Sequence, residues 1–169
     1  MKMGEKTEKN LGKAFACESK ASLRNAAFAL KAEKEGYISA AKLFKAVSDS
    51  ESVHANRFLL LMRGKIGSTE ENLKTAFENE IKANADEYPQ LIRDAEEEGA
   101  NNAVMKALNQ TGYVEERHAQ LYKSMINDMI EGRKTDYYVC QICGYISENE
   151  VPENCPVCGA VSSRFKAVS

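Results

Sequence analysis

The sequence predicts an all-α four-helix bundle followed by a small C-terminal β/knuckle domain, and two observations carry that prediction. Residues 5–131 contain a single proline, Pro89, and are rich in Ala, Leu, Lys and Glu, which is helix composition. From Tyr137 the composition changes to Cys, Gly, Pro, Val and Tyr, which is typical of short strands and turns. We therefore expect two domains, residues 1–134 and residues 135–169.

Glycines and one capping sequence divide the helical part. Gly36, Gly64 with Gly67, and Gly99 are each placed as helix C-termini, and Ser68 begins a sequence typical of a capped helix start. Pro89 should kink the third helix or be absorbed by a local distortion. The four helices are expected at about residues 5–34, 37–63, 69–98 and 100–131.

The net charge and the distribution of apolar residues exclude several classes of function. A net charge of −2 with 28% charged residues gives no electrostatic reason to bind nucleic acid or an anionic membrane. No apolar run approaches a membrane span, and the N-terminal residues lack the apolar core of an export signal, so we expect a cytoplasmic protein. In such a protein, four cysteines as two C-x-x-C pairs favour metal ligation over disulfides.

The only two histidines each follow a glutamate by three residues, in Glu51-x-x-His54 and Glu115-x-x-His118. Positions i and i+3 share one face of a helix, so each pair can ligate one metal ion. Glutamate occupies 20 of 169 positions, so two such pairs have a chance probability of about 0.014.

Each predicted helix places a glutamate within an otherwise largely apolar stripe. Glu18 and Glu80 occupy these positions on the first and third helices, in addition to the two motif glutamates. Carboxylates buried together need cations to balance their charge. Two divalent ions balance four carboxylates, and each ion then has one neutral imidazole as a further ligand. This is the ligand constellation of the di-iron carboxylate bundles, with one Glu from each of two helices and Glu-x-x-His from each of the others. Taken singly, Glu18 and Glu80 would instead be ordinary surface residues.

We expect Glu51 and Glu115 to bridge the two ions, with Glu18 and Glu80 as terminal ligands. The predicted site therefore comprises Glu18, Glu51, His54, Glu80, Glu115 and His118.

The tail carries two matched knuckles, Cys140-x-x-Cys143-Gly and Cys155-x-x-Cys158-Gly, with eleven residues between them. Four thiolates at this spacing bind one tetrahedral ion, either iron or zinc. The remaining cysteine, Cys17, is expected to be a small core residue.

With these motifs the chain resembles rubrerythrin over nearly its full length. The resemblance includes Ala14-Phe-Ala-Cys-Glu18, Glu87-Tyr88-Pro89, both Glu-x-x-His motifs and the cysteine tail. It implies a ferritin-like di-iron bundle, a rubredoxin-like iron centre and a tyrosine, Tyr88, beside the di-iron ligands. It also implies reduction of hydrogen peroxide, with electrons from rubredoxin or an NAD(P)H-dependent reductase through the tetrathiolate iron to the di-iron site.

Two positions depart from the family pattern. Ala83 stands where rubrerythrins usually carry a further glutamate, and Asn25 stands where they usually carry a tyrosine. The site is in this respect closer to the six-ligand sites of bacterioferritin or sulerythrin. We expect His54 to ligate in both oxidation states and O₂ to compete with peroxide.

Two alternatives to a peroxidase remain. One is a ferritin-type protein that oxidises Fe(II) with O₂, scavenges oxygen or handles iron, and the other is a structural protein with zinc in both places. For assembly, the short link between the second and third helices predicts a domain-swapped homodimer. We further expect the tail of one subunit to approach a di-iron site through another subunit's helices.

Overall fold

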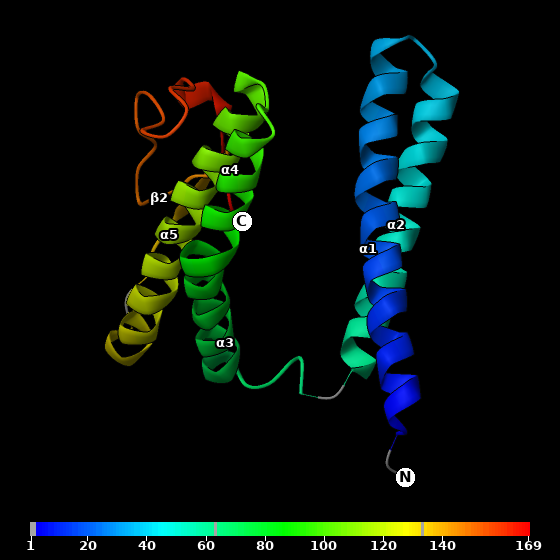
Figure 1. Ribbon diagram of the computed structural model, residues 1–169, viewed down its shortest axis with the longest axis horizontal. Helices are drawn as coiled ribbons and strands as arrows, with labels where there is room; N and C mark the ends of the chain where they lie inside the picture. The colour runs from blue at the N-terminus through cyan, green and yellow to red at the C-terminus, as the bar shows by residue number, and fades with distance from the viewer. Residues whose placement is uncertain (1–2, 63, 133) are drawn as a thin grey trace. The chain divides into compact units, whose positions relative to one another are not determined.

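A computed structural model describes residues 3–62, 64–132 and 134–169 of the chain (Figure 1). The chain forms two compact units, residues 1–67 and residues 68–169. Each unit is a helical hairpin, and the second also contains the cysteine tail. The predicted boundary between residues 134 and 135 falls inside the second unit and stays a prediction.

The first unit consists of α1 (Glu5–Lys34) and α2 (Ile38–Leu61), which lie side by side in Figure 1. Small buried side chains allow the two helices to approach closely; they are Ala29, Ala32, Ala41, Ser48 and Ala55. Ser22 and Ser48 join the helices, because each hydroxyl donates to the other residue's carbonyl oxygen at 2.9 Å. Cys17, expected in the core, is exposed in this unit.

The second unit contains α3 (Thr69–Lys82), a π-helical turn η1 (Ala83–Glu87), α4 (Tyr88–Glu97) and α5 (Asn102–Glu131). The expected distortion at Pro89 is this π turn, in which the Tyr88 N–H bonds to the Ala83 carbonyl five residues earlier. The turn adds one residue to the helical repeat ahead of a proline that has no N–H to donate.

The helix ends agree closely with the sequence prediction. Ser68 and Glu71 form a capping box: the Ser68 N–H donates to Glu71 Oε2 at 2.7 Å, and the Glu71 N–H donates to Ser68 Oγ at 3.2 Å. Gly36 and Gly99 follow α1 and α4 with φ of 83° and 68°, a conformation that favours glycine. The predicted end of the second helix at residue 63 lies outside the described residues.

The tail is a three-stranded antiparallel sheet with a short 3₁₀ turn, η2 (Ser162–Arg164). Its strands are β1 (Tyr137–Cys140), β2 (Ile146–Glu148) and β3 (Phe165–Ala167), in the order β2-β1-β3. Tyr138 pairs with Ser147 on one side and with Ala167 on the other. The predicted β/knuckle domain is confirmed: the first knuckle joins β1 to β2, and the second lies between Asn154 and Val161, which form an isolated antiparallel bridge.

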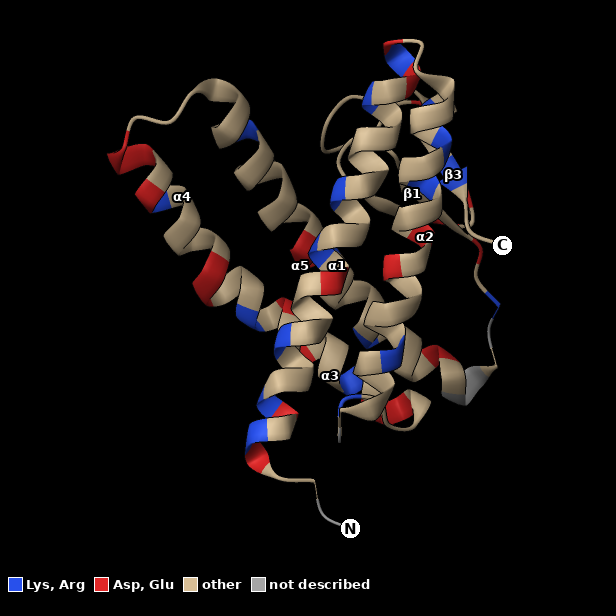
Figure 2. Cartoon of the chain, turned by 90° about the vertical axis from the view of Figure 1, so that its right-hand side faces the viewer, with Lys and Arg blue, Asp and Glu red and all other residues tan. Residues whose placement is uncertain are grey.

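Acidic and basic residues are interspersed along α1 in Figure 2. Over the described residues, none of the helices is both long and apolar enough to cross a membrane.

Candidate metal centres

The α1–α2 hairpin brings together three of the predicted site residues. Glu18, Glu51 and His54 each offer a ligand atom within 4.8 Å of the others. His54 Nδ1 lies 2.8 Å from Glu51 Oε2, as expected for positions three apart on α2. The Ser22–Ser48 bonds lie one turn from Glu18 and Glu51, so they hold the two helices together next to the group.

The two carboxylates in this hairpin compete for one proton. A hydrogen bond to Glu51, followed by burial and the negative charge of Glu51, raises the pKa of Glu18. Hydrogen bonds from His54 and then Glu18 lower the pKa of Glu51. The group therefore holds excess negative charge that a bound cation would neutralise.

The second hairpin repeats this arrangement with Glu80, Glu115 and His118, whose ligand atoms also lie within 4.8 Å of one another. His118 Nδ1 lies 2.9 Å from Glu115 Oε2 and 3.9 Å from Glu80 Oε1. These side chains are more enclosed than those of the first hairpin, since His118 is 23% exposed and His54 is 48% exposed.

Two tyrosines surround this second group. Burial, followed by the charge of Glu115 and a hydrogen bond to it, raises the pKa of Tyr88. Burial and the charges of Glu80 and Glu115 raise the pKa of Tyr122. Burial, and then the hydrogen bond to Glu115, raise the pKa of Glu80 itself. Tyr88 thus shares a hydrogen bond with this group, whereas Tyr122 is affected only by its charge and by burial.

The donor sets of both groups fit a divalent metal ion. Each offers two carboxylates and one imidazole, ligand types that suit iron, zinc and manganese. In the second group, His118 Nδ1 faces both carboxylates, so the imidazole presents a ligand atom beside the Glu80 and Glu115 oxygens. The structure brings the six predicted residues together as two groups of three.

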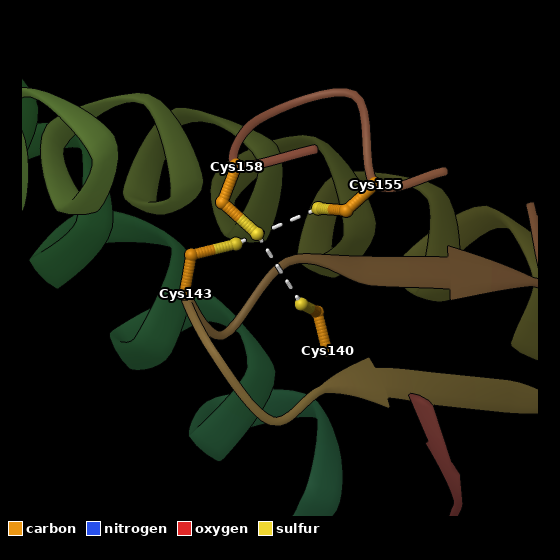
Figure 3. A group of neighbouring side chains, drawn as sticks. All are labelled: Cys140, Cys143, Cys155 and Cys158. Atoms are coloured by element: carbon orange, nitrogen blue, oxygen red, sulfur yellow. Dashed lines mark hydrogen bonds between the residues drawn. The ribbon is translucent and has the colours of Figure 1, made fainter. Parts of the chain in front are cut away.

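The four tail cysteines converge from both knuckles in Figure 3. Cys140 Sγ lies 3.7 Å from Cys158 Sγ, and Cys143 Sγ lies 3.6 Å from Cys155 Sγ. Sulfur atoms around a tetrahedral ion with metal–sulfur bonds of about 2.3 Å are separated by about 3.8 Å. A disulfide would instead require about 2.05 Å. The geometry therefore fits one tetrahedral ion.

The knuckle backbones are built alike. Gly144 and Gly159 have φ of 83° and 74°, and their N–H groups bond to the Cys140 and Cys155 carbonyls at 2.9 Å. Burial and, secondarily, the neighbouring thiols raise the pKa of Cys143, although the Tyr145 N–H opposes them. At Cys140 burial also raises the pKa, but N–H groups of Cys143 and Ile142 outweigh it, so this thiol ionises more readily.

A helical protein with two matched carboxylate–histidine groups and a tetrathiolate tail belongs to the class of ferritin-like di-iron proteins with a rubredoxin-like domain. Comparison with known families agrees. The sequence model of the rubrerythrin family matches residues 9–126, and that of the rubrerythrin rubredoxin-like domain matches residues 138–166. The chain belongs to the rubrerythrin family, which places it among the oxidoreductases, and the family's metal centres are a di-iron site and a rubredoxin-like four-cysteine centre.

Individual relatives cover nearly the whole chain. Rubrerythrin of Porphyromonas gingivalis is 34% identical over 96% of this chain and 90% of its own. Nigerythrin of Nitratidesulfovibrio vulgaris is 32% identical over 95% of this chain and 86% of its own. A solved structure of nigerythrin in a mixed-valence state matches with a TM-score of 0.56 at 31% identity, covering 99% of this chain and 88% of that one.

Some residues near the site escaped sequence reasoning. Tyr122 follows His118 by one turn, and its spacing predicts a place on the same inward stripe but no role at the site. Gly112 carries no sequence signal, yet a Cβ there would lie 3.4 Å from Tyr88 Cβ, so the glycine leaves room for that tyrosine. Two positions differ from the usual family pattern. Asn25 donates a hydrogen bond to the carbonyl of Ala21 on its own helix, and Ala83 begins the π turn.

Proposed function

We propose that the protein reduces hydrogen peroxide to water at a di-iron site fed by the tetrathiolate iron. The observation that carries the proposal is the presence, in one chain, of two matched Glu/Glu-x-x-His groups and a four-sulfur centre. Glu18, Glu51 and His54 would hold one half of the iron pair, and Glu80, Glu115 and His118 the other. Cys140, Cys143, Cys155 and Cys158 would hold the third iron.

When bound and reduced, the iron pair would supply the two electrons that convert H₂O₂ and two protons into two water molecules. The chain's own residues manage the protons. Glu80 and Glu115 would act as carboxylate ligands, because a bound cation displaces the proton that they could share without it. Tyr88 approaches Glu115 and keeps its phenolic proton, because its pKa is raised. We propose that the Tyr88 phenol delivers one proton to a departing oxygen and that solvent supplies the other.

The electron donor would be rubredoxin or an NAD(P)H-dependent reductase, acting in the cytoplasm, where cysteines remain reduced. Residues 1–134 would form the catalytic domain and residues 135–169 the electron-receiving domain. A tail built to hold a redox ion favours this function over pure iron storage, which needs no electron entry.

The experiment compares two oxidants. The protein is loaded with iron and reduced anaerobically, and its reoxidation by H₂O₂ and by O₂ is followed by stopped flow. A peroxide rate well above the O₂ rate supports the peroxidase. A dominant O₂ rate would instead support the ferroxidase or oxygen-scavenging function. Ala83 favours this alternative, because it stands where the family usually has a glutamate. Ala83→Glu should raise the ratio of peroxide to O₂ rates. If the oxidised protein lacks the visible band of tetrathiolate Fe(III), the four-cysteine site holds zinc and not iron.

We further propose a domain-swapped homodimer, in which α1 and α2 of one subunit complete a bundle with α3 and α5 of the other. In a ferritin-like bundle the second and third helices run parallel, so their link must return along the bundle. Seven residues separate Leu61 from Thr69 and span at most about 25 Å. The 24 residues of α2 extend about 36 Å, so one chain cannot make this return.

Apolar side chains that remain exposed in the first hairpin are consistent with such a partner. Leu23, Leu43 and Val53 are 75%, 64% and 58% exposed, and large exposed apolar surfaces mark interaction sites.

Co-expression of Glu51→Ala and Glu115→Ala chains tests the swap. In a swapped heterodimer both defects fall in one site, and the other site is intact. Random pairing then restores about a quarter of the wild-type di-iron sites, since half the dimers are mixed and each has one good site of two. Each variant expressed alone is the control and should have none. Absence of any recovery in the mixture would show that each site is built from a single chain.

A further inference from the structure

Helix α5 contains a glycine, Gly112, in its interior. Glycine in the interior of a helix lowers stability relative to alanine, because its backbone loses more freedom on folding. Two common reasons for a glycine do not apply to this one. It does not end a helix, and its backbone does not adopt the positive φ that Gly99 and Gly132 have at helix ends. The property that remains is the missing side chain.

The side of α5 that this glycine leaves bare faces Tyr88. A Cβ added at position 112 would lie 3.4 Å from Tyr88 Cβ, 3.6 Å from its Cγ and 3.8 Å from its Cδ1. Carbon atoms attract best at about 3.5–4.0 Å, so a methyl group would already press on Tyr88, and a larger side chain would displace it. Gly12 of α1 is different, because a Cβ there would meet Met62 Sδ at 3.9 Å, an ordinary contact.

Tyr88 reaches the carboxylate–histidine group from this place. Its hydroxyl donates a hydrogen bond to Glu115, which follows Gly112 by three residues on the same face of α5. Three helical residues rise about 4.5 Å. With its base beside Gly112 and its hydroxyl at Glu115, the ring therefore extends along α5, and a side chain at position 112 would stand where the ring begins.

The π turn supplies the other half of this arrangement. Tyr88 directly follows η1 and lies eight residues after Glu80. Eight residues of an uninterrupted α-helix would turn a side chain about 80° away from the first, whereas the extra residue of a π turn brings it back to within about 20°. Lys82 and Glu87, five residues apart, form an ion pair at 3.5 Å across this turn. The turn thus directs Tyr88 toward the site, and Gly112 gives it room there.

The corresponding position of the first hairpin does have a side chain. Ser48 precedes Glu51 by three residues, as Gly112 precedes Glu115. The Ser48 side chain is buried and bonds to the Ser22 carbonyl. The bare position therefore occurs in the hairpin that holds a phenol beside its ligands.

We propose that Gly112 is a positioning residue, whose bare backbone lets the Tyr88 ring lie along α5 and keeps its hydroxyl at Glu115. The task of the phenol, delivery of one proton, belongs to the proposed function, and the inference rests on it. Gly112 touches no reacting group and acts only through Tyr88. A substitution at position 112 should therefore affect the reaction to the extent that it moves the phenol.

The first measurement needs no redox chemistry. In the zinc-loaded protein, nuclear Overhauser contacts should join the Tyr88 ring protons to the Gly112 α-protons. With ¹³C-labelled tyrosine, the phenol carbon of Tyr88, assigned by its loss in Tyr88→Phe, reports the bond to Glu115. Gly112→Val should shift this signal toward that of Tyr37, which is 66% exposed, and Gly12→Ala should leave it in place. Missing contacts in the wild type, or an unshifted signal in Gly112→Val, would overturn the inference.

The second measurement tests whether Gly112 acts through Tyr88. Gly112→Val and Tyr88→Phe should each lower peroxide turnover of the iron-loaded protein about tenfold, the lower end for residues that support metal ligands. The double variant should also be about tenfold slower than the wild type. Two independent roles would multiply to about a hundredfold, and that result would contradict a role through Tyr88. Gly12→Ala is the control and should keep the wild-type turnover.

Gly112→Ala separates positioning from folding, and it keeps the inference testable if the valine variant does not fold. Alanine favours a helix, so the unfolding midpoint of the metal-free protein should not fall in this variant. Its turnover should nevertheless fall below that of Gly12→Ala, because the methyl group presses on Tyr88. A midpoint and a turnover that fall together would show that Gly112 is needed for packing. An unchanged turnover would show that a bare backbone is not needed.

The outcomes distinguish this inference from the proposed function. If peroxide does not oxidise the wild-type di-iron site, the proposed function fails, and the zinc-form spectra still decide whether Gly112 holds Tyr88 at Glu115. If the wild type reduces peroxide and the phenol signal moves in Gly112→Val without loss of turnover, the proposed function stands and the positioning role of Gly112 fails.

Discussion

The two helical hairpins carry the same ligand motif in different surroundings. In the α1–α2 hairpin the motif histidine, His54, is 48% exposed. In the α3–α5 hairpin its counterpart, His118, is 23% exposed and is accompanied by Tyr88 and Tyr122. A repeated ligand set therefore does not produce a repeated environment, and the difference lies in the residues around the ligands.

The π turn explains part of this difference. Asn25 lies seven residues, about two turns, after Glu18, whereas Tyr88 lies eight residues after Glu80. The extra residue of η1 brings position 88 to the place that position 25 has on α1. At that place the second hairpin has a phenol near Glu115, and the first has an amide that bonds to its own backbone.

The largest expected effect comes from removing each motif histidine. His118→Ala should weaken binding of the iron pair by more than about a hundredfold, the upper end of the loss for outer-shell partners. His54→Ala should have a smaller effect if each hairpin keeps, in the assembled site, the exposure that it has in a single chain, because water could then reach the more exposed ion and replace the imidazole. Metal content after dialysis measures both. The tetrathiolate iron, read from its visible band, is the internal control, and equal losses would show that enclosure does not matter.

The next effect concerns the phenol that only one hairpin has. Tyr88→Phe removes its interaction with Glu115 and should reduce di-iron affinity or turnover about tenfold. Tyr122→Phe is the matched control, because the pKa of Tyr122 is raised by burial and charge without a hydrogen bond to either glutamate. Asn25→Tyr should give the first hairpin the phenol that it lacks, so that the surroundings of its ligands resemble those in the second hairpin.

Turnover that falls equally in the two Phe variants would mean that the Tyr88 hydroxyl has no special role. Gly112→Leu gives an independent test, since its side chain would displace Tyr88 and should reproduce the Tyr88→Phe effect.

The helices and the grouping of the candidate ligands could be predicted from the sequence, but their surroundings could not. Glu-x-x-His spacing, glycine ends and the Ser68 cap are local signals, and the structure places the helices within a few residues of the prediction. The π turn could be predicted only as a distortion near Pro89, because its type depends on hydrogen-bond register. The Arg117–Glu148 pair joins residues 31 apart in the sequence, and no periodicity reveals such a contact.

The hairpins also differ in how their helices are joined, and this predicts a moderate effect. Ser48→Ala removes a buried hydroxyl that bonds to the Ser22 carbonyl and should destabilise the α1–α2 hairpin by about 1 kcal/mol. Ser19→Ala is the matched control, because Ser19 bonds to Phe15 of its own helix. Denaturant unfolding of the metal-free protein measures both. Equal effects would show that the bonds between the helices are no more important than those within one helix.

The smallest effect lies at the helix starts. No side-chain cap begins α1, whereas Ser68 and Glu71 form the capping box of α3. Hydrogen bonds from the Ser68 backbone and then its side chain lower the pKa of Glu71 below its ordinary value. A lowered folded-state pKa means that this stabilisation is present above the unfolded pKa and is lost as pH falls through the folded value.

Glu71→Gln should therefore be less stable than the wild type at neutral pH, and the difference should shrink as Glu71 protonates. Unfolding curves at about pH 7 and about pH 3, on either side of the usual glutamate range, measure this, with Glu70→Gln as the control on the same turn. A difference that stays constant with pH would show that the cap acts through shape and not through the Glu71 charge.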